Sequence, residues 1–186
     1  KDEEVRPDST LEKLSRLRTV YDSPTVTPGN APGLSTGAAA LVLTTAAEAK
    51  ARGIEPLATI RTWAMASGHP DKIASIPAHA GQKALDQLGL TVDDVDLIEI
   101  NEAFAAMPLV ATYILGDGDE DRVEAIRDKT NVNGGAIAIG HPTGASAARL
   151  VMTIVYALKE RGGGLGLATI CGGIGQGEAV IVEVAG

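Results

Sequence analysis

Short apolar runs typical of buried strands alternate with helical stretches from residue 57 to the C-terminus, and this alternation constrains the fold more than any other feature. The pattern predicts strands at residues 57–66, 95–100, 166–171 and 179–184 and helices at residues 78–88, 102–115, 122–127 and 142–159. We assign the order βαβαβαββ, which contains one strand more than these four ranges, and in which a glycine turn joins the last two strands as a hairpin. Strands that alternate with helices predict a layered α/β sheet, here with one antiparallel edge.

Single residues predict where two of these helices begin or end. Gly89 is expected to close the helix at residues 78–88. Pro142 is expected to be the first residue of the helix at residues 142–159, because a missing N–H has no helical partner to lose there. The small residues at 144–148 would let this helix lie deep against the sheet.

The chain upstream of residue 57 has a different character. Residues 1–33 are polar and contain four prolines, which predicts an extended loop. Residues 38–45 suit a strand buried on both faces of a sheet, and residues 46–52 suit a short helix that ends at Gly53. One alanine-rich helix across residues 38–52 is the alternative. Because the chain starts with neither methionine nor a recognisable domain beginning, we expect a fragment, a processed product or a trimmed chain.

Composition excludes several classes of protein. The net charge of −8 has the wrong sign for a nucleic-acid or anionic-membrane surface, so we expect neither partner. The 22 glycines are incompatible with a heptad pattern. The single cysteine, Cys171, excludes an intrachain disulfide and a thiolate zinc cluster and favours a reducing compartment. The sequence has no apolar signal region and no run of membrane-spanning length, which predicts a cytoplasmic protein.

Reactive residues gather at three places where predicted elements end. Asn101 opens the cluster Asn-Glu-Ala-Phe after a strand, His141 precedes the helix expected at Pro142, and Cys171 stands before two glycines after a strand. Ligands of open α/β sheets gather at strand C-termini and helix N-termini, so the three clusters are expected to converge on one pocket. A thiol, an imidazole, an amide and backbone N–H groups are the parts that acyl transfer requires.

Each of these residues also has a structural interpretation. Cys171 could be a small buried apolar residue. His141 could cap the helix that Pro142 opens, and Asn101 could cap the helix that follows it. The glycines next to Cys171 could serve only to form a turn. Taken one at a time, these structural interpretations compete with catalysis at every position.

Other catalytic templates are absent or incomplete. The sequence contains no GxxxxGK[ST], no GxGxxG and no HExxH. The segment nearest to a serine-nucleophile turn, at residues 144–148, lacks the final glycine and is expected inside a helix. His69 and His79 are expected to be structural or solvent-facing. Nucleotide and zinc chemistry are therefore disfavoured, and a small α/β hydrolase is a distant rival.

Three segments together resemble the C-terminal signatures of the thiolase family. They are NEAFA at residues 101–105, NVNGGAIAIGHPTGAS at residues 131–146 and CGGIGQG at residues 171–177. Upstream, RPDSTLEKLSRL resembles the end of the thiolase loop domain, and TVTPGNAPGLSTGAAALVL resembles the stretch that leads to the last strand of its N-terminal domain. The resemblance covers essentially the whole chain but about half of a family member. Related ketoacyl synthases typically lack a proton-shuttling cysteine, so Asn101-Glu102 with Cys171 favours a thiolase.

The resemblance implies a thiolase-like layered α/β fold in three regions. Residues 1–35 would be the tail of the loop domain, residues 36–53 the last strand and helix of the N-terminal domain, and residues 54–186 the C-terminal domain. Thiolases transfer acyl groups to or from coenzyme A by Claisen condensation or by thiolysis of 3-ketoacyl-CoA. The thioester would be the substrate, and no other cofactor and no metal is implied.

The resemblance also implies a partner. In thiolases the acylated cysteine belongs to the N-terminal half, so we expect a partner that carries that half and a further homo- or hetero-oligomer. A non-catalytic half-thiolase that binds or scaffolds another acyl-CoA enzyme is the alternative.

The resemblance assigns roles to four residues. His141 matches the histidine that activates the acylated cysteine, and Cys171 matches the second cysteine, which shuttles the proton at the α-carbon. Asn101 matches the residue that holds an oxyanion-hole water, and the N–H of Gly173 would stabilise the other thioester oxyanion. Proximity to His141 and to glycine N–H groups is expected to favour the thiolate of Cys171.

Departures from the family pattern lie where the substrate is expected to bind. The expected substrate-binding residues are Ala31, Pro32, Ile73, Ala103 and Phe104. Pro32 stands where many thiolases have a serine near the pantetheine, and Ile73 lies where they have a Gly-rich, Met-containing loop. Ile174 follows the Cys-Gly-Gly triplet where a further glycine is common. The reactive groups are kept while these contacts change, which leaves the acyl specificity and the direction of the reaction open.

Overall fold

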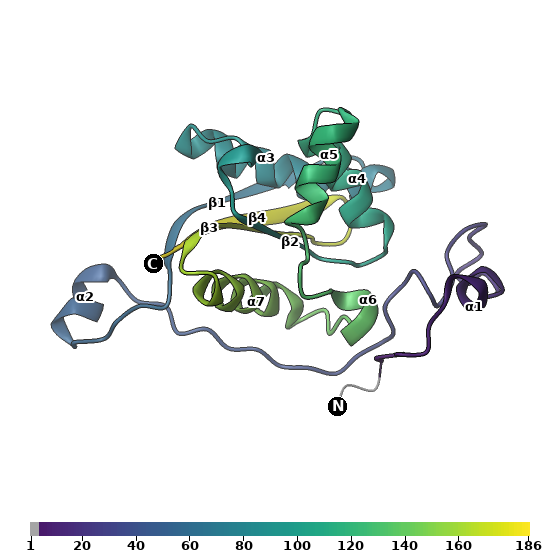
Figure 1. Cartoon of the computed structure of the whole chain (residues 1–186), viewed down its shortest axis with the longest axis horizontal. Helices are drawn as coiled ribbons and strands as arrows, with labels where there is room; N and C mark the ends of the chain where they lie inside the picture. The colour runs from purple at the N-terminus through teal and green to yellow at the C-terminus, as the bar shows by residue number, and fades with distance from the viewer. Residues whose placement is uncertain (1–3) are drawn as a thin grey trace.

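The computed structural model describes residues 4–186, which form a helix-covered sheet preceded by a long extended segment (Figure 1). The helices and strands, in chain order, are α1 (Leu11–Ser15), α2 (Ala46–Ala51), β1 (Thr59–Ser67), the 3-10 helix η1 (Pro70–Ser75), α3 (Ile76–Leu88), the 3-10 helix η2 (Val92–Asp94), β2 (Leu97–Ile100), α4 (Ala106–Leu115), α5 (Glu120–Asp128), α6 (Ala136–Ile139), α7 (Ser146–Glu160), β3 (Gly164–Cys171) and β4 (Gln176–Val184). Each helix and strand predicted after residue 57 has a counterpart whose ends differ by a few residues. Gly89 ends α3 in the left-handed conformation, with a φ of 67°, as predicted.

The strands of the sheet have the order β1-β4-β3-β2. β4 runs antiparallel to both of its neighbours, whereas β2 and β3 are parallel. The predicted terminal hairpin is confirmed as β3 and β4. The predicted antiparallel edge is also present, but β1 forms it, because β1 pairs with the side of β4 that the hairpin leaves free and so places β4 inside the sheet.

A further strand that the order βαβαβαββ requires is reduced to a single bridge. Thr130 forms an isolated parallel bridge with Ile98, and the N–H of Asn131 donates to the carbonyl O of Ile98 at 2.8 Å. Gly134 then turns the chain with a φ of 79°, and α6 follows. Within residues 4–186 the sheet has four strands, because the chain leaves the edge of β2 after this bridge.

Helices cover both faces of this sheet (Figure 1). α3, α4 and α5 lie on one face, and α7 lies on the other. Two apolar clusters fill the layers, one with Leu85, Ile98, Leu167 and Ile181 at its centre, the other with Leu150, Ile154, Leu158 and Val182. Each large aliphatic side chain buried in this way stabilises the folded state by about 1.5–3 kcal/mol relative to an exposed one. The layered α/β architecture predicted from the alternating pattern is confirmed. No helix within residues 4–186 is long and apolar enough to cross a membrane.

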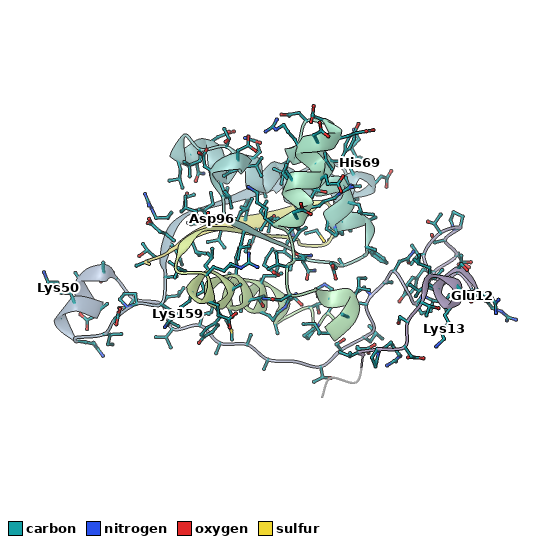
Figure 2. All side chains as sticks on the ribbon, viewed as in Figure 1. Glu12, Lys13, Lys50, His69, Asp96 and Lys159 are labelled. Atoms are coloured by element: carbon teal, nitrogen blue, oxygen red, sulfur yellow. The ribbon has the colours of Figure 1, made fainter. Side chains whose placement is uncertain are left out.

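The chain before β1 is an extended segment that passes outside the α7 layer (Figure 1). Its small helices α1 and α2 lie at opposite ends of the molecule, where Glu12, Lys13 and Lys50 are exposed (Figure 2). Residues 38–45 pair with no strand of the described chain, so the strand predicted there is not formed, since a strand needs a hydrogen-bonded neighbour. Val42 keeps 97% of its surface exposed. The alternative of one helix across residues 38–52 is also wrong, because α2 begins only at Ala46.

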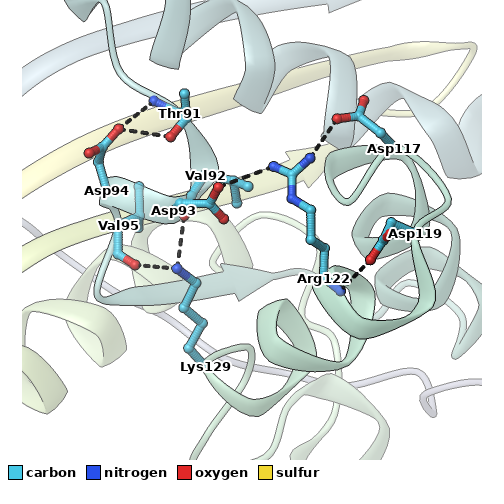
Figure 3. Close-up of polar contacts among 9 residues, drawn as sticks. All are labelled: Thr91, Val92, Asp93, Asp94, Val95, Asp117, Asp119, Arg122 and Lys129. Carbon is cyan, nitrogen blue, oxygen red and sulfur yellow. Dashed lines mark hydrogen bonds and ion pairs between the residues drawn. The ribbon is translucent and has the colours of Figure 1, made fainter.

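A polar cluster fixes the loop between α3 and β2 beside α5 (Figure 3). The Nζ of Lys129 donates to the carbonyl oxygens of Val92 at 2.8 Å and Val95 at 2.6 Å. Nearby, Arg122 forms ion pairs with Asp117 at 2.8 Å and with Asp93 at 3.3 Å. Lys129 is half-buried and satisfies two backbone acceptors, whereas the carboxylates that pair with Arg122 are largely exposed.

Lys129→Met should lower the free energy of unfolding by about 1–3 kcal/mol, because two part-buried carbonyls lose their donor. Arg122→Met is the matched control: it removes a cation from the same cluster but breaks only solvent-screened ion pairs, so little change is expected. Urea unfolding of the three proteins measures the difference. Equal losses in both variants would contradict the role assigned to Lys129.

Candidate functional site

Asn101 follows β2 at the edge of the sheet where the parallel strands β2 and β3 both end. Its backbone N–H donates to the carbonyl O of Thr169 at 3.0 Å, which places it beside β3 close to Cys171. The side chain is fully buried, and its Nδ2 lies 3.3 Å from the Nε2 of His141. α4 begins only at Ala106, so the interpretation of Asn101 as a helix cap is excluded.

His141 lies in the turn between α6 and α7 and is held at three points. Its backbone N–H donates to the Oγ of Ser35 at 3.1 Å, and its Nδ1 lies 2.6 Å from the Oγ of Ser146. The third contact is the one with Asn101. The prediction that Pro142 opens the helix was wrong: residues 143–145 form a turn, and α7 begins at Ser146. His141 is therefore not a helix cap.

The hydrogen bonds around His141 select one tautomer of the neutral ring. The Ser146 hydroxyl donates to the carbonyl O of Pro142 at 3.1 Å, so its oxygen accepts the Nδ1–H of His141. Nε2 then keeps its lone pair and accepts a hydrogen bond from the Nδ2 of Asn101. Burial first, and the positive charge of Arg149 second, lower the pKa of His141. The imidazole is thus neutral near pH 7, with its basic nitrogen toward Asn101.

The upstream segment approaches His141 through a glycine. Gly140 has a φ of 97°, and a Cβ at this position would lie 2.3 Å from the Oγ of Ser35. A residue with a side chain would be strained by the left-handed backbone and would push Ser35 away from His141. The Oγ of Ser35 also donates to the carbonyl O of Gly33 at 2.9 Å. A residue far upstream in the sequence therefore holds the backbone of His141.

Four of the predicted substrate-binding residues lie on two joined segments. The loop that carries Ala31 and Pro32 is linked to the segment that carries Ala103 and Phe104. The linking hydrogen bond runs from the backbone N–H of Ala105 to the carbonyl O of Asn30 at 2.9 Å. Ile73 is half-buried in η1, which packs on α4 instead.

The glycine turn after Cys171 adopts a left-handed backbone. Gly173, Ile174 and Gly175 have φ values of 38°, 49° and 76°. Ile174 is exposed, and a β-branched residue in this conformation costs about 1–2 kcal/mol, a cost that glycine would avoid. A Cβ placed on Gly173 would meet no atom within 4 Å, so the space beside its backbone is open.

Burial raises the pKa of the Cys171 thiol, and a hydrogen bond with its own backbone offsets part of this rise. The expectation that His141 and the glycine N–H groups favour the thiolate was wrong, because desolvation of the half-buried sulfur is the larger effect. Cys171 is therefore a protonated thiol at neutral pH, next to a sheet edge that also carries a neutral imidazole.

Sequence reasoning assigned no role in the site to three polar residues that organise it. Ser146 fixes the imidazole, Ser35 fixes the backbone of His141, and Glu102 fixes the first turn of α6. The Oε2 of Glu102 accepts the N–H of Ile137 at 2.9 Å. Glu102 lies within the signature at residues 101–105, and Ser146 is the last residue of the signature at residues 131–146, but no local pattern predicts their contacts. Ser35 lies in no motif that predicts a contact with His141.

The other histidines lie outside this site. His69 and His79 are both exposed, as expected. Within residues 4–186 no three histidine, cysteine, aspartate or glutamate side chains are grouped so that they could hold a metal ion.

Family models match almost the whole chain. The model of the thiolase C-terminal domain matches residues 54–184, and the model of the thiolase N-terminal domain matches residues 1–47. An acetyl-CoA acetyltransferase of Rhizobium meliloti is 48% identical over 183 residues, which are 98% of this chain and 44% of the relative. A 3-ketoacyl-CoA thiolase of Aeromonas salmonicida is 44% identical over 184 residues, with 98% of this chain and 46% of the relative covered.

Solved structures show the same relationship. The acetyl-CoA acetyltransferase of Bacillus anthracis superposes with a TM-score of 0.90 at 40% identity, covering 99% of this chain and 45% of that one. Human mitochondrial 3-ketoacyl-CoA thiolase in complex with CoA superposes with a TM-score of 0.85 at 36% identity, covering 100% of this chain and 45% of that one. The thiolase-like fold expected from the sequence is confirmed, and the chain spans a little under half the length of these relatives.

Ser146→Ala should shift His141 toward the tautomer with its proton on Nε2, because Nδ1 loses the oxygen that accepts its proton. Long-range ¹H–¹⁵N NMR spectra of the imidazole distinguish the two tautomers. Ser75→Ala removes a serine hydroxyl that bonds only within η1 and serves as the control. An unaltered tautomer in Ser146→Ala would contradict the proposed hydrogen-bond network.

Proposed function

Because the chain belongs to the thiolase family, we propose that it is the C-terminal part of a thiolase, which transfers acyl groups to or from coenzyme A by Claisen condensation or by thiolysis of 3-ketoacyl-CoA. The observation that carries the proposal is the neutral imidazole of His141, whose basic Nε2 meets the buried amide of Asn101. A coenzyme A thioester is the proposed substrate, in keeping with the CoA named for one of the similar structures.

The neutral imidazole suits the first proton transfer. In the proposed reaction the Nε2 of His141 takes the proton of a cysteine thiol on an N-terminal thiolase domain, and the thiolate attacks the acyl carbonyl. Asn101 holds the water that completes the oxyanion hole for this step. The backbone N–H of Gly173 stabilises the oxyanion of the other thioester.

The protonated thiol of Cys171 suits the second proton transfer. In thiolysis, the bond between the α- and β-carbons of 3-ketoacyl-CoA breaks, and the resulting enolate takes its proton from Cys171. In condensation, the coenzyme A thiolate that leaves during acylation takes the thiol proton of Cys171, and the resulting thiolate removes a proton from the α-carbon of an acyl thioester, whose enolate then attacks the acylated cysteine. We propose that Ala31, Pro32, Ile73, Ala103 and Phe104 contact the pantetheine or acyl group.

The N-terminal thiolase domain is the proposed source of the acylated cysteine. We propose that residues 1–35 belong to its loop domain, that residues 36–53 complete its sheet and its last helix, and that residues 54–186 form the C-terminal domain. The unpaired, exposed residues 38–45 support this assignment, because they are apolar and have free hydrogen-bonding edges. A symmetric oligomer of the completed units is part of the same proposal.

An apolar groove marks the face on which we propose that this domain docks. The groove has a volume of about 360 Å³ and is lined by α7, the sheet and the extended segment, including Leu41, Trp63, Val151 and Val180. Trp63 on the edge strand β1 keeps 65% of its surface exposed. Exposed apolar surface of this kind typically marks a protein interface.

Cys171→Ala, combined with an N-terminal thiolase domain, should lose exchange of the α-proton by about 10²- to 10⁴-fold, the typical effect of a positioned acid–base group, and should keep acylation. His141→Asn should lose acylation itself. Burst labelling with acetyl-CoA measures acylation, and deuterium incorporation into the acetyl methyl group measures exchange. Exchange at the wild-type rate in Cys171→Ala would refute its role. A wild-type mixture that binds acyl-CoA without acylation or exchange would favour the scaffold alternative.

Trp63→Asp should weaken association with the N-terminal domain, because it places a charge in the apolar groove. Tyr113→Asp is the matched control, since Tyr113 is 57% exposed on α4, on the opposite face of the sheet. Size-exclusion chromatography with light scattering measures the complex, and hydrogen exchange follows residues 38–45. A chain that stays monomeric on its own and is protected at residues 38–45 would contradict the docking proposal.

A further inference from the structure

Glu99 is a carboxylate in the middle of an otherwise apolar strand. The other residues of β2 are leucine or isoleucine, and Glu99 keeps 2% of its surface exposed. Side chains alternate between the two faces along a strand, so Glu99 points to the same face as Leu97, which packs on α7. Asn101, two residues further on, is placed on that face as well. Glu99 and Asn101 therefore both face α7.

Arg149 of α7 meets Glu99 across this interface. Its Nη1 lies 3.4 Å from the Oε2 of Glu99, and 22% of its side chain is exposed. Its Nη2 is buried and has no hydrogen-bond partner among residues 4–186. Arg149 follows Ser146 by about one helical turn, so the two side chains share the face of α7 that points to β2. The ion pair and the hydrogen bonds of His141 thus belong to one β2–α7 interface.

The charges around this interface are few. Burial raises the pKa of Glu99 to about 7, Arg149 counteracts this rise, and the negative charge of Glu102 adds to it. The carboxylate of Glu102 is itself held by the N–H of Ile137. Lys129, beside β2, points to two backbone carbonyls. Arg149 is the cation that acts on both Glu99 and His141.

We propose that Glu99 and Arg149 are positioning residues for His141: Glu99 holds the guanidinium of Arg149 beside the site, and the charge of the guanidinium disfavours a second proton on the imidazole. This inference rests on the proposed function, in which His141 must be neutral to accept a proton. Neither residue touches the substrate, and both act through His141. The pair also explains the buried carboxylate, because an unpaired Arg149 would be a costly charge at this interface.

The pKa of His141 can be measured without any reaction. Hydrogen–deuterium exchange at the C2 carbon of imidazole depends on ring protonation, and mass spectrometry of peptides reads it in the 186-residue chain. Arg149→Met should raise the pKa of His141, whereas Arg149→Lys, which keeps the charge, should leave it lowered. Glu99→Gln should change it little, because the pKa of Glu99 is about 7 and its carboxyl group is already mostly protonated where His141 titrates. The exposed His69 and His79 are internal controls and should not respond.

A double variant protects this test against misfolding. Glu99→Gln combined with Arg149→Met leaves no unpaired buried charge, and it should raise the pKa of His141 as Arg149→Met alone does. The proposal is overturned by an unchanged pKa in the double variant or by a rise in Glu99→Gln. It is also overturned if Arg149→Lys raises the pKa as much as Arg149→Met does.

A second readout is the pH dependence of acylation with an N-terminal thiolase domain. A raised pKa of His141 keeps the ring protonated to higher pH, so Arg149→Met should move the acid limb of the rate profile to higher pH. The rate on the alkaline plateau should stay close to wild type, because neutral His141 is then present in both proteins. Absence of acylation in the wild-type mixture would contradict the proposed function, and the imidazole titration would still decide the role of the pair.

Discussion

Helix α7 packs so closely on β3 that a side chain at Gly166 would have to displace buried side chains of the helix. A Cβ on Gly166 would lie 2.7 Å from the Cδ1 of Ile154 and 2.9 Å from the Cδ1 of Leu158, both of which are completely buried. This contact limits the distance between the helix and the sheet. The position of Ser146, in the first turn of the same helix, depends on that distance. The imidazole of His141 depends on Ser146, and the amide of Asn101 depends on the β2–β3 pairing. The chemistry at the sheet edge therefore rests on how tightly α7 packs.

Desolvation shifts the pKa values of His141 and Cys171, the two groups proposed to transfer protons, in opposite directions. It lowers the pKa of His141 and raises the pKa of Cys171, because burial disfavours whichever form carries the charge. At neutral pH the protein therefore carries an unprotonated base, His141, and a protonated acid, Cys171. A reaction with one proton abstraction and one proton donation requires a base and an acid whose pKa values are shifted apart in this way. The charge of Arg149, held by Glu99, acts in the same direction on His141 as burial does.

Local patterns were sufficient for most elements of the C-terminal layer. Apolar periodicity located the strands and the long helices, the left-handed glycine ended α3, and the glycine turn specified the hairpin, because each of these features depends on residues close together in the sequence. Pairing did not follow from the same patterns. β4 lies inside the sheet because β1 takes its free edge, and residues 38–45 have strand composition but no neighbour within the described chain. Whether a segment pairs as a strand depends on which other segments lie beside it in the fold, and these segments can be distant in the sequence.

The sequence by itself determined which reactive groups this protein carries, and it placed Asn101, His141 and Cys171 near the ends of strands and helices. Only the tertiary structure decided how these groups are tuned. Ser35 and Ser146 reach His141 from separate segments, Glu99 meets Arg149 across two layers, and burial rather than neighbouring N–H groups sets the protonation of Cys171. Residue types are local information, whereas solvent exclusion and charge proximity arise only when distant segments pack together, and these two effects set the pKa values on which the proposed chemistry depends.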